Sequence, residues 1–123
     1  MKSKQFIRFQ NKYKNVRQTI DGINFDSKKE ADYYLQLKIE KKARLIKDFE
    51  RQVSFELRGW TANAQKEVGI AVCRHIVDFY VTLKDGTKEV REVKSYGTMT
   101  DVWKLKHKLF EANYPDIPYR IIL

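Results

Sequence analysis

Two carboxylates and a lysine in one short segment have the clearest chemical potential in this 123-residue chain. The segment, residues 74–94, reads RHIVDFYVTLKDGTKEVREVK. Asp78 lies in its first apolar run, and Glu92 and Lys94 close its second. Carboxylate oxygens bind hard divalent cations such as Mg²⁺ and Mn²⁺. A lysine beside them can hold an attacking water or stabilise the charge that grows on a phosphate, so the combination predicts metal-dependent hydrolysis of a phosphodiester.

The two apolar runs predict a β-hairpin around the Asp-Gly pair at 85–86, and its loop decides whether the acids can meet. With a two-residue loop, Asp78 faces Val93 and Glu92 points through the other side of the sheet. With a loop that begins one residue earlier, Asp78 stands opposite Glu92, and Gly86 takes the left-handed third position. The sequence allows both loops. The hydrolytic function requires the longer one, or a bulge that restores the same parity.

The longer loop would place the acids close enough to share an ion. Directly opposed side chains of antiparallel strands have Cβ atoms about 4.5–5.5 Å apart, where like charges are destabilising unless a cation lies between them. Lys94 follows Glu92 by two residues and therefore shares its face. The alternative is that Asp78, Glu92 and Lys94 form an ordinary surface salt bridge.

A helix is expected to bring a further acid. Ser27-Lys28-Lys29-Glu30 is a capping-box pattern, and it predicts a helix from this point to about residue 47. Glu30 would lie in the first turn, where it could hold a metal-bound water or a second ion. The alternative is that Glu30 serves only as the acid of the capping box.

The remaining pattern predicts one α/β domain over residues 1–123, with residues 1–15 as a basic arm that is flexible or grips phosphates. A hairpin over 16–25 precedes the first helix. Strands are expected over 51–58, 71–83, 89–94 and 119–123, and a second helix over about 100–113. That helix should turn Val102, Leu105, Leu109 and Ala112 toward the core.

The charge balance favours a polyanionic partner. The chain has 25 basic and 16 acidic residues and a net charge of +9, which suits DNA, RNA or an acidic membrane surface. No apolar run is long enough for a membrane helix, and Cys73 is the only cysteine, so we expect a cytoplasmic protein without a disulfide framework. The candidate DNA contacts are Lys12, Lys14, Arg17, Lys28, Tyr96, Lys104, Lys106 and Lys108.

His75 and His107 are the two histidines and the candidates for a general base. The two-residue strand period puts His75 on the face opposite to Asp78, which favours a role in packing. His107 shares a helix face with Trp103 and Phe110. Lys104, Lys108 and Glu111 share another face, which is either solvated or lies along a phosphate backbone.

The order of three motifs resembles that of the PD-(D/E)XK nuclease superfamily: Glu30 in SKKEADYYLQLK, Asp78 in IVDFYV, and Glu92 with Lys94 in REVK. More closely, the chain is similar to a family of small phage proteins of unknown function in that superfamily, some of them labelled Holliday junction resolvase-like. The similarity extends from NKYKNVR through FDSKKEA and RQVSFEL to WKLKHKLFEANYP. Val77 stands where the superfamily's name has proline, which is a tolerated variation.

The resemblance implies a restriction-endonuclease-like core, with a central mixed sheet of four to five strands, two main flanking helices and an N-terminal β-hairpin. It implies catalytic roles for Glu30, Asp78, Glu92 and Lys94. The Mg²⁺ or Mn²⁺ ligands would be Asp78, Glu92, the backbone carbonyl of Val93, and Glu30 through a water. Gln52 matches a polar position of some relatives and is added to the candidate DNA contacts.

The implied activity is an endodeoxyribonuclease that leaves 5′-phosphate and 3′-hydroxyl ends. Its substrate would be branched DNA such as a Holliday junction, as expected for a phage recombination protein in the cytoplasm of the host cell. Two coordinated nicks in a junction need two active sites, which predicts a homodimer. The alternatives are a nuclease for duplex, flap or replication-intermediate DNA, and a phage DNA-binding protein that does not cut.

Overall fold

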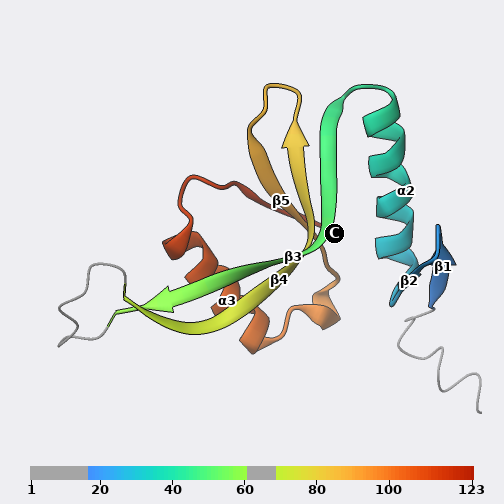
Figure 1. The fold of residues 1–123 in the computed structure, drawn as a ribbon. Coiled ribbons are helices and arrows are strands. Elements are labelled where there is room, and N and C mark those ends of the chain that lie inside the picture. The colour runs from blue at the N-terminus through green and yellow to red at the C-terminus, as the bar shows by residue number, and fades with distance from the viewer. Residues whose placement is uncertain (1–16, 61–68) are drawn as a thin grey trace, which may run out of the picture. The chain divides into compact units, whose positions relative to one another are not determined.

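The computed structural model describes residues 17–60 and 69–123. It divides into two compact units, Met1–Ala43 and Arg44–Leu123, which are described separately. The prediction of a single domain therefore stays a prediction. In chain order the elements are β1 (Gln18–Ile20), β2 (Ile23–Phe25), α2 (Lys28–Lys42), β3 (Ile46–Gly59), β4 (Ile70–Leu83), β5 (Lys88–Val93), the 3₁₀ turn η1 (Tyr96–Thr98), α3 (Asp101–Asn113) and β6 (Tyr119–Ile122) (Figure 1).

The predicted fold class is confirmed. The chain is α/β, with a four-stranded sheet in the order β3-β4-β5-β6, a separate two-stranded sheet of β1 and β2, and two main helices. Strands β3, β4 and β5 pair antiparallel, and β6 pairs parallel to β5. The sheet is therefore mixed, as expected.

The first unit holds the hairpin and α2. Ser27 caps the helix, since its Oγ accepts a hydrogen bond from the backbone amide of Glu30 at 3.1 Å. The helix ends at Lys42, earlier than the predicted residue 47, and Arg44 follows with a φ of 61°. That left-handed conformation turns the chain out of the helix. The hairpin packs on the helix through Phe25 and Tyr34, whose ring centroids are 5.1 Å apart.

The β4–β5 hairpin adopts the longer of the two predicted loops. The amide of Leu83 donates to the carbonyl of Thr87 at 2.7 Å, and the amide of Gly86 donates to the carbonyl of Leu83 at 2.9 Å. Gly86 has a φ of 91°, which glycine adopts without the strain that a Cβ would bring. Phe79 consequently pairs with Arg91 and Tyr80 with Val90.

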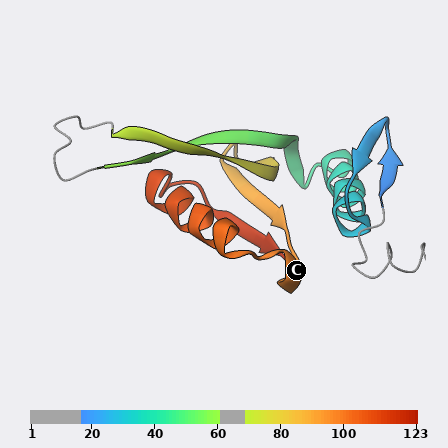
Figure 2. The same cartoon turned by 90° about the horizontal axis from the view of Figure 1, so that it is seen from below.

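The core of the second unit lies between the sheet and α3, which runs along one sheet face (Figure 2). Leu57, Val77, Val90 and Phe110 form a fully buried cluster. The predicted inward face of α3 is correct at Leu109, which packs against the core, and wrong at Val102 and Leu105, whose side chains are 64% and 69% exposed, and at the exposed Ala112. The helix instead turns Trp103, His107 and Phe110 toward Tyr119, with ring centroids 6.5, 4.3 and 5.1 Å away.

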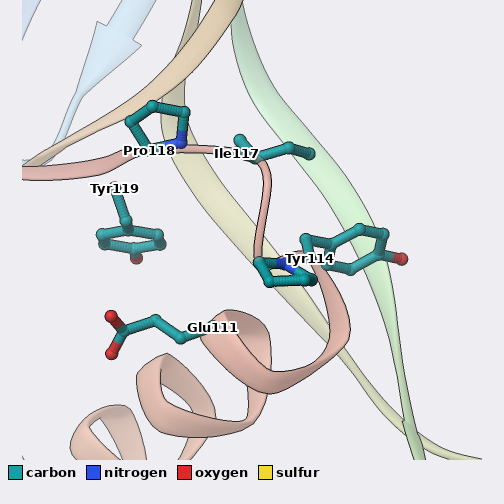
Figure 3. Close-up of a pocket in the computed structure, with 6 residues that line it drawn as sticks. Glu111, Tyr114, Ile117, Pro118 and Tyr119 are labelled. Atoms are coloured by element: carbon teal, nitrogen blue, oxygen red, sulfur yellow. The ribbon is translucent and has the colours of Figure 1, made fainter.

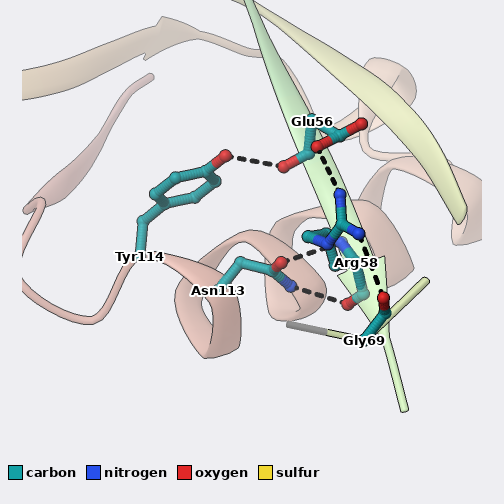
Figure 4. A network of polar contacts seen from close by, with 5 residues as sticks. All are labelled: Glu56, Arg58, Gly69, Asn113 and Tyr114. Atoms are coloured by element: carbon teal, nitrogen blue, oxygen red, sulfur yellow. Dashed lines mark hydrogen bonds and ion pairs between the residues drawn. The ribbon is translucent and has the colours of Figure 1, made fainter. Parts of the chain in front are cut away.

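Polar contacts fix the C-terminal end of α3 to β3 (Figure 4). The side chain of Asn113 accepts from the Arg58 amide at 2.8 Å and donates to the Arg58 carbonyl at 3.0 Å. The hydroxyl of Tyr114 donates to the carbonyl of Glu56 at 2.7 Å. These bonds anchor the C-terminal end of α3 to the last residues of β3.

In the described parts of the chain, residues 17–60 and 69–123, no helix is long and apolar enough to cross a lipid bilayer.

Candidate active site

The register of β4 and β5 brings the two predicted acids together. Continuing the pairing of Phe79 with Arg91 by one residue places Asp78 opposite Glu92. Asp78 Oδ2 accepts a hydrogen bond from the Val93 amide at 2.9 Å, so the aspartate reaches across to the neighbouring strand. The predicted parity is confirmed.

A backbone irregularity positions Asp78. Its neighbour across β3 would be Gln52, which has a φ of 51°, and pairing runs from Arg51–Phe79 to Val53–Val77 around them. The two-residue alternation reverses here. Before Asp78 in the chain, the odd-numbered His75 and Val77 contact the buried cluster between the sheet and α3. After Asp78, the even-numbered Tyr80 contacts the same cluster. Residues held in such sparsely populated backbone conformations cluster at active sites.

This reversal corrects the prediction for His75, which we expected on the face opposite to Asp78. Its Nε2 lies 2.8 Å from the hydroxyl of Tyr119, and that hydroxyl donates to Glu92 Oε2 at 2.9 Å. His75 is buried, as a packing role requires, but it belongs to the site. Burial, followed by the charges of nearby cations, lowers its pKa to about 4, so the imidazole is neutral at pH 7.

Lys94 lies on the same side of the sheet as Glu92. Its Nζ is 4.9 Å from the centroid of the Trp103 ring, a cation–π geometry that holds the ammonium group in place. Trp103 in turn stacks on His107, with ring centroids 5.0 Å apart. The aromatic face of α3 therefore supports the lysine.

The electrostatics of the acid pair are unusual. Glu92 is only 4% exposed, and burial, followed by the charge of Asp78, raises its pKa to about 8. Burial also raises the pKa of Asp78, against the hydrogen bond from the Val93 amide and the charge of Lys94. Two neighbouring carboxyl groups with raised pKa values are typical of functional sites.

A cleft of about 310 Å³ opens beside Glu92 and Lys94. Strand β4 and helix α3 form its walls, and two further cations, Arg74 and Lys106, line it. Lys106 Nζ donates to the carbonyl of Arg74 at 3.3 Å across the cleft. The full lining is Arg74, His75, Ile76, Glu92, Lys94, Thr100, Val102, Trp103 and Lys106.

The donor set fits a hard divalent cation. Protein donors orient both carboxyl groups, Asp78 through the Val93 amide and Glu92 through Tyr119, and the two acids also hydrogen-bond to one another. A cation that takes the place of the proton between them would bind one oxygen of each. Oxygen-only ligands suit Mg²⁺ or Mn²⁺. Over residues 17–60 and 69–123, no three His, Cys, Asp or Glu side chains gather as one metal site. The ion would therefore complete its shell with water, substrate or backbone oxygen.

The other predicted residues are distributed as follows. Glu30 lies in the first turn of α2, in the first unit, and its role stays a prediction, as does that of the Val93 carbonyl. Lys12 and Lys14 lie outside the described residues. Lys28 forms an ion pair with Asp32 at 2.8 Å. Arg17, Gln52, Tyr96, Lys104 and Lys108 are exposed, and Lys106 is the one DNA-contact candidate that lines the cleft.

Sequence reasoning missed Tyr119 and Trp103 as parts of the site. Tyr119 begins a short strand, and nothing in its spacing marks it as a partner of Glu92.

Comparison with protein families gives one result: the family described as "Protein of unknown function (DUF1064)" matches residues 10–123. No curated protein matches the chain, and no solved structure does.

Proposed function

The chain belongs to this family of unknown function, and we propose from its own residues that it is a metal-dependent endodeoxyribonuclease. One observation carries the proposal. The three-residue turn sets a register in which Asp78 stands opposite Glu92, with Lys94 beside a cleft lined by further cations. The resemblance to PD-(D/E)XK nucleases supports the same assignment.

Each residue has a distinct part in hydrolysis. Asp78 and Glu92 would hold the cation. The cation would lower the pKa of the attacking water and stabilise the negative charge on the phosphate. Lys94 stabilises the negative charge that develops as water attacks the phosphorus, and the Trp103 ring keeps its ammonium group in place. Glu30 is proposed to contribute from α2, by holding a water or a second ion.

The bond changes are simple. The water oxygen bonds to phosphorus in line with the departing 3′ oxygen, and the P–O3′ bond breaks. One proton of the water goes to the leaving oxygen and the second passes to solvent, and the products are 5′-phosphate and 3′-hydroxyl ends. Lys106 and Arg74 in the cleft suit the adjacent phosphates by charge.

We propose branched DNA as the preferred substrate, and a homodimer as the acting form on four-way junctions. This part rests on the resemblance to resolvase-like phage proteins. Duplex, flap and replication-intermediate DNA are the competing substrates, and a panel of substrates separates them.

The test is cleavage of labelled four-way junction, flap, duplex and single-stranded DNA in Mg²⁺ and in EDTA. We expect Mg²⁺-dependent nicking that Asp78→Asn abolishes, while DNA binding in EDTA is retained. Asp116→Asn, in the exposed loop between α3 and β6, is the matched control and should cut normally. Wild-type protein that binds DNA but cuts no substrate in Mg²⁺ or Mn²⁺ would leave the non-catalytic DNA-binding function instead.

A further inference from the structure

The start of β6 supplies a contact to the acid pair that the motif does not contain. Tyr119 pairs with Val90 of β5, and its side chain extends from the strand toward α3 (Figure 3). There it is surrounded by the rings of His75, His107 and Phe110, with centroids 6.0, 4.3 and 5.1 Å away. The phenol is therefore held on several sides, and its hydroxyl has a fixed direction.

The hydroxyl joins two groups of the site. It donates to Glu92 Oε2 at 2.9 Å, and it lies 2.8 Å from His75 Nε2. A phenol has one proton, so when that proton goes to the carboxylate, His75 must carry its own proton on Nε2 and donate to the phenol oxygen. The hydrogen bonds His75–Tyr119–Glu92 then have a single direction, and together with the backbone of Asp78 they fix the rotation of the glutamate.

We propose that Tyr119, supported by His75, is the positioning residue for Glu92: it holds Oε2 so that Oε1 faces the same ion as Asp78. The inference rests on the proposed function of the site. Groups that orient a metal-binding carboxylate through its other oxygen typically change metal affinity or activity by about 10–100-fold when removed.

The test compares two tyrosines of the same cluster. Tyr119→Phe keeps the packed ring and removes the hydroxyl that Glu92 uses. Tyr114→Phe is the matched control, because that ring also contacts Phe110, at 5.0 Å, and its hydroxyl serves only the Glu56 carbonyl of β3 among the described bonds. His75→Ala removes the imidazole at the far end of this series of hydrogen bonds without altering either partner of the Tyr119–Glu92 bond.

Mn²⁺ affinity of the DNA-free protein, measured by titration calorimetry, is the first readout. We expect Tyr119→Phe to weaken binding by about 10–100-fold, His75→Ala to weaken it less, and Tyr114→Phe to leave it unchanged. In cleavage assays, Tyr119→Phe should lower kcat with little change in KM for DNA, and high Mn²⁺ concentration should restore part of the loss. Thermal unfolding confirms that each variant is folded.

The outcomes separate the two proposals. If wild-type protein cuts DNA and Tyr119→Phe binds Mn²⁺ as tightly as Tyr114→Phe, the positioning role is wrong and the nuclease assignment stands. If wild-type protein binds Mn²⁺ in a Tyr119-dependent way but cuts no DNA, the positioning role stands and the nuclease assignment is wrong. Wild-type protein that binds no Mn²⁺ overturns the positioning role directly.

Discussion

The raised pKa of Glu92 makes a prediction about stability without any substrate. In the folded protein Glu92 keeps its proton up to a pKa of about 8, whereas in the unfolded chain it titrates near 4.5. A carboxyl group with a raised folded-state pKa stabilises the fold below its unfolded pKa, and this contribution is lost as pH rises through the folded value. Metal-free protein should therefore lose stability toward alkaline pH.

The pKa of His75 sets the pH range in which this loss of folding stability can be measured by itself. Its pKa falls from 6.5 to about 4 on folding, so its contribution is present above pH 6.5 and is lost as pH falls toward 4. Below pH 6.5 the two groups oppose one another. From pH 6.5 to pH 8 the loss comes from the acid pair, since the pKa of Glu92 reaches about 8 and that of Asp78 is raised as well. At about 1.36 kcal/mol per pH unit, the expected loss is about 2 kcal/mol.

The assay is urea unfolding in EDTA at pH 6.5 and pH 8, at one ionic strength. Glu92→Gln is the matched variant, since the amide is neutral throughout and still offers Tyr119 an acceptor. It should show little loss over the window. Divalent cation should reverse the wild-type trend, because it binds the ionised carboxylates. Equal wild-type stability at both pH values, or an undiminished loss in Glu92→Gln, would refute the reasoning.

Three further predictions concern single side chains. Lys94→Met should lower kcat by about 10²–10³-fold without weakening DNA binding in EDTA, and normal cleavage by this variant would exclude charge stabilisation by Lys94. Gly86→Ala should cost about 1 kcal/mol in urea unfolding, because its φ of 91° strains any residue with a Cβ, and an unchanged midpoint would contradict the turn. Phe110→Ala should cost about 3–5 kcal/mol and Val102→Ala under about 0.5 kcal/mol, and the reverse order would restore the helix face expected from sequence.

Local turn chemistry was sufficient to limit the register to two alternatives. Once the loop holds a glycine at its left-handed position, the pairing of every later residue in the hairpin follows by counting. This is why the opposition of Asp78 and Glu92 could be stated as one of two alternatives before any coordinates. The choice between the loops needed the structure, because both fit an Asp-Gly turn.

The face of His75 could not be predicted, because the side chains of β4 do not alternate without a break as those of a regular strand do. Gln52, on the facing strand, adopts a left-handed conformation that an ordinary glutamine disfavours. No residue type in this part of the sequence predicts that left-handed conformation. The side-chain order along β4 reverses at this irregularity, and His75 therefore lies on the side of the acids.

The predicted inward face of α3 was wrong at Val102 and Leu105 for a different reason. Apolar residues lie on both sides of this helix, and aliphatic periodicity selected Val102 and Leu105 over Trp103 and His107. The aromatic face is the buried one because it can pack around Tyr119 and support Lys94 as well as fill the core. Tyr119 itself lies far from the acids in sequence, so only the parallel pairing of β6 with β5 reveals its role.

Anomalous diffraction from crystals grown with Mn²⁺ tests the shared ion site most directly. We expect a peak about 2.1 Å from the free carboxylate oxygens of both Asp78 and Glu92, with the Tyr119 hydroxyl still on the other oxygen of the glutamate. Crystals in which Mn²⁺ binds elsewhere, or in which the two carboxylates leave opposite faces of the sheet, would contradict the account.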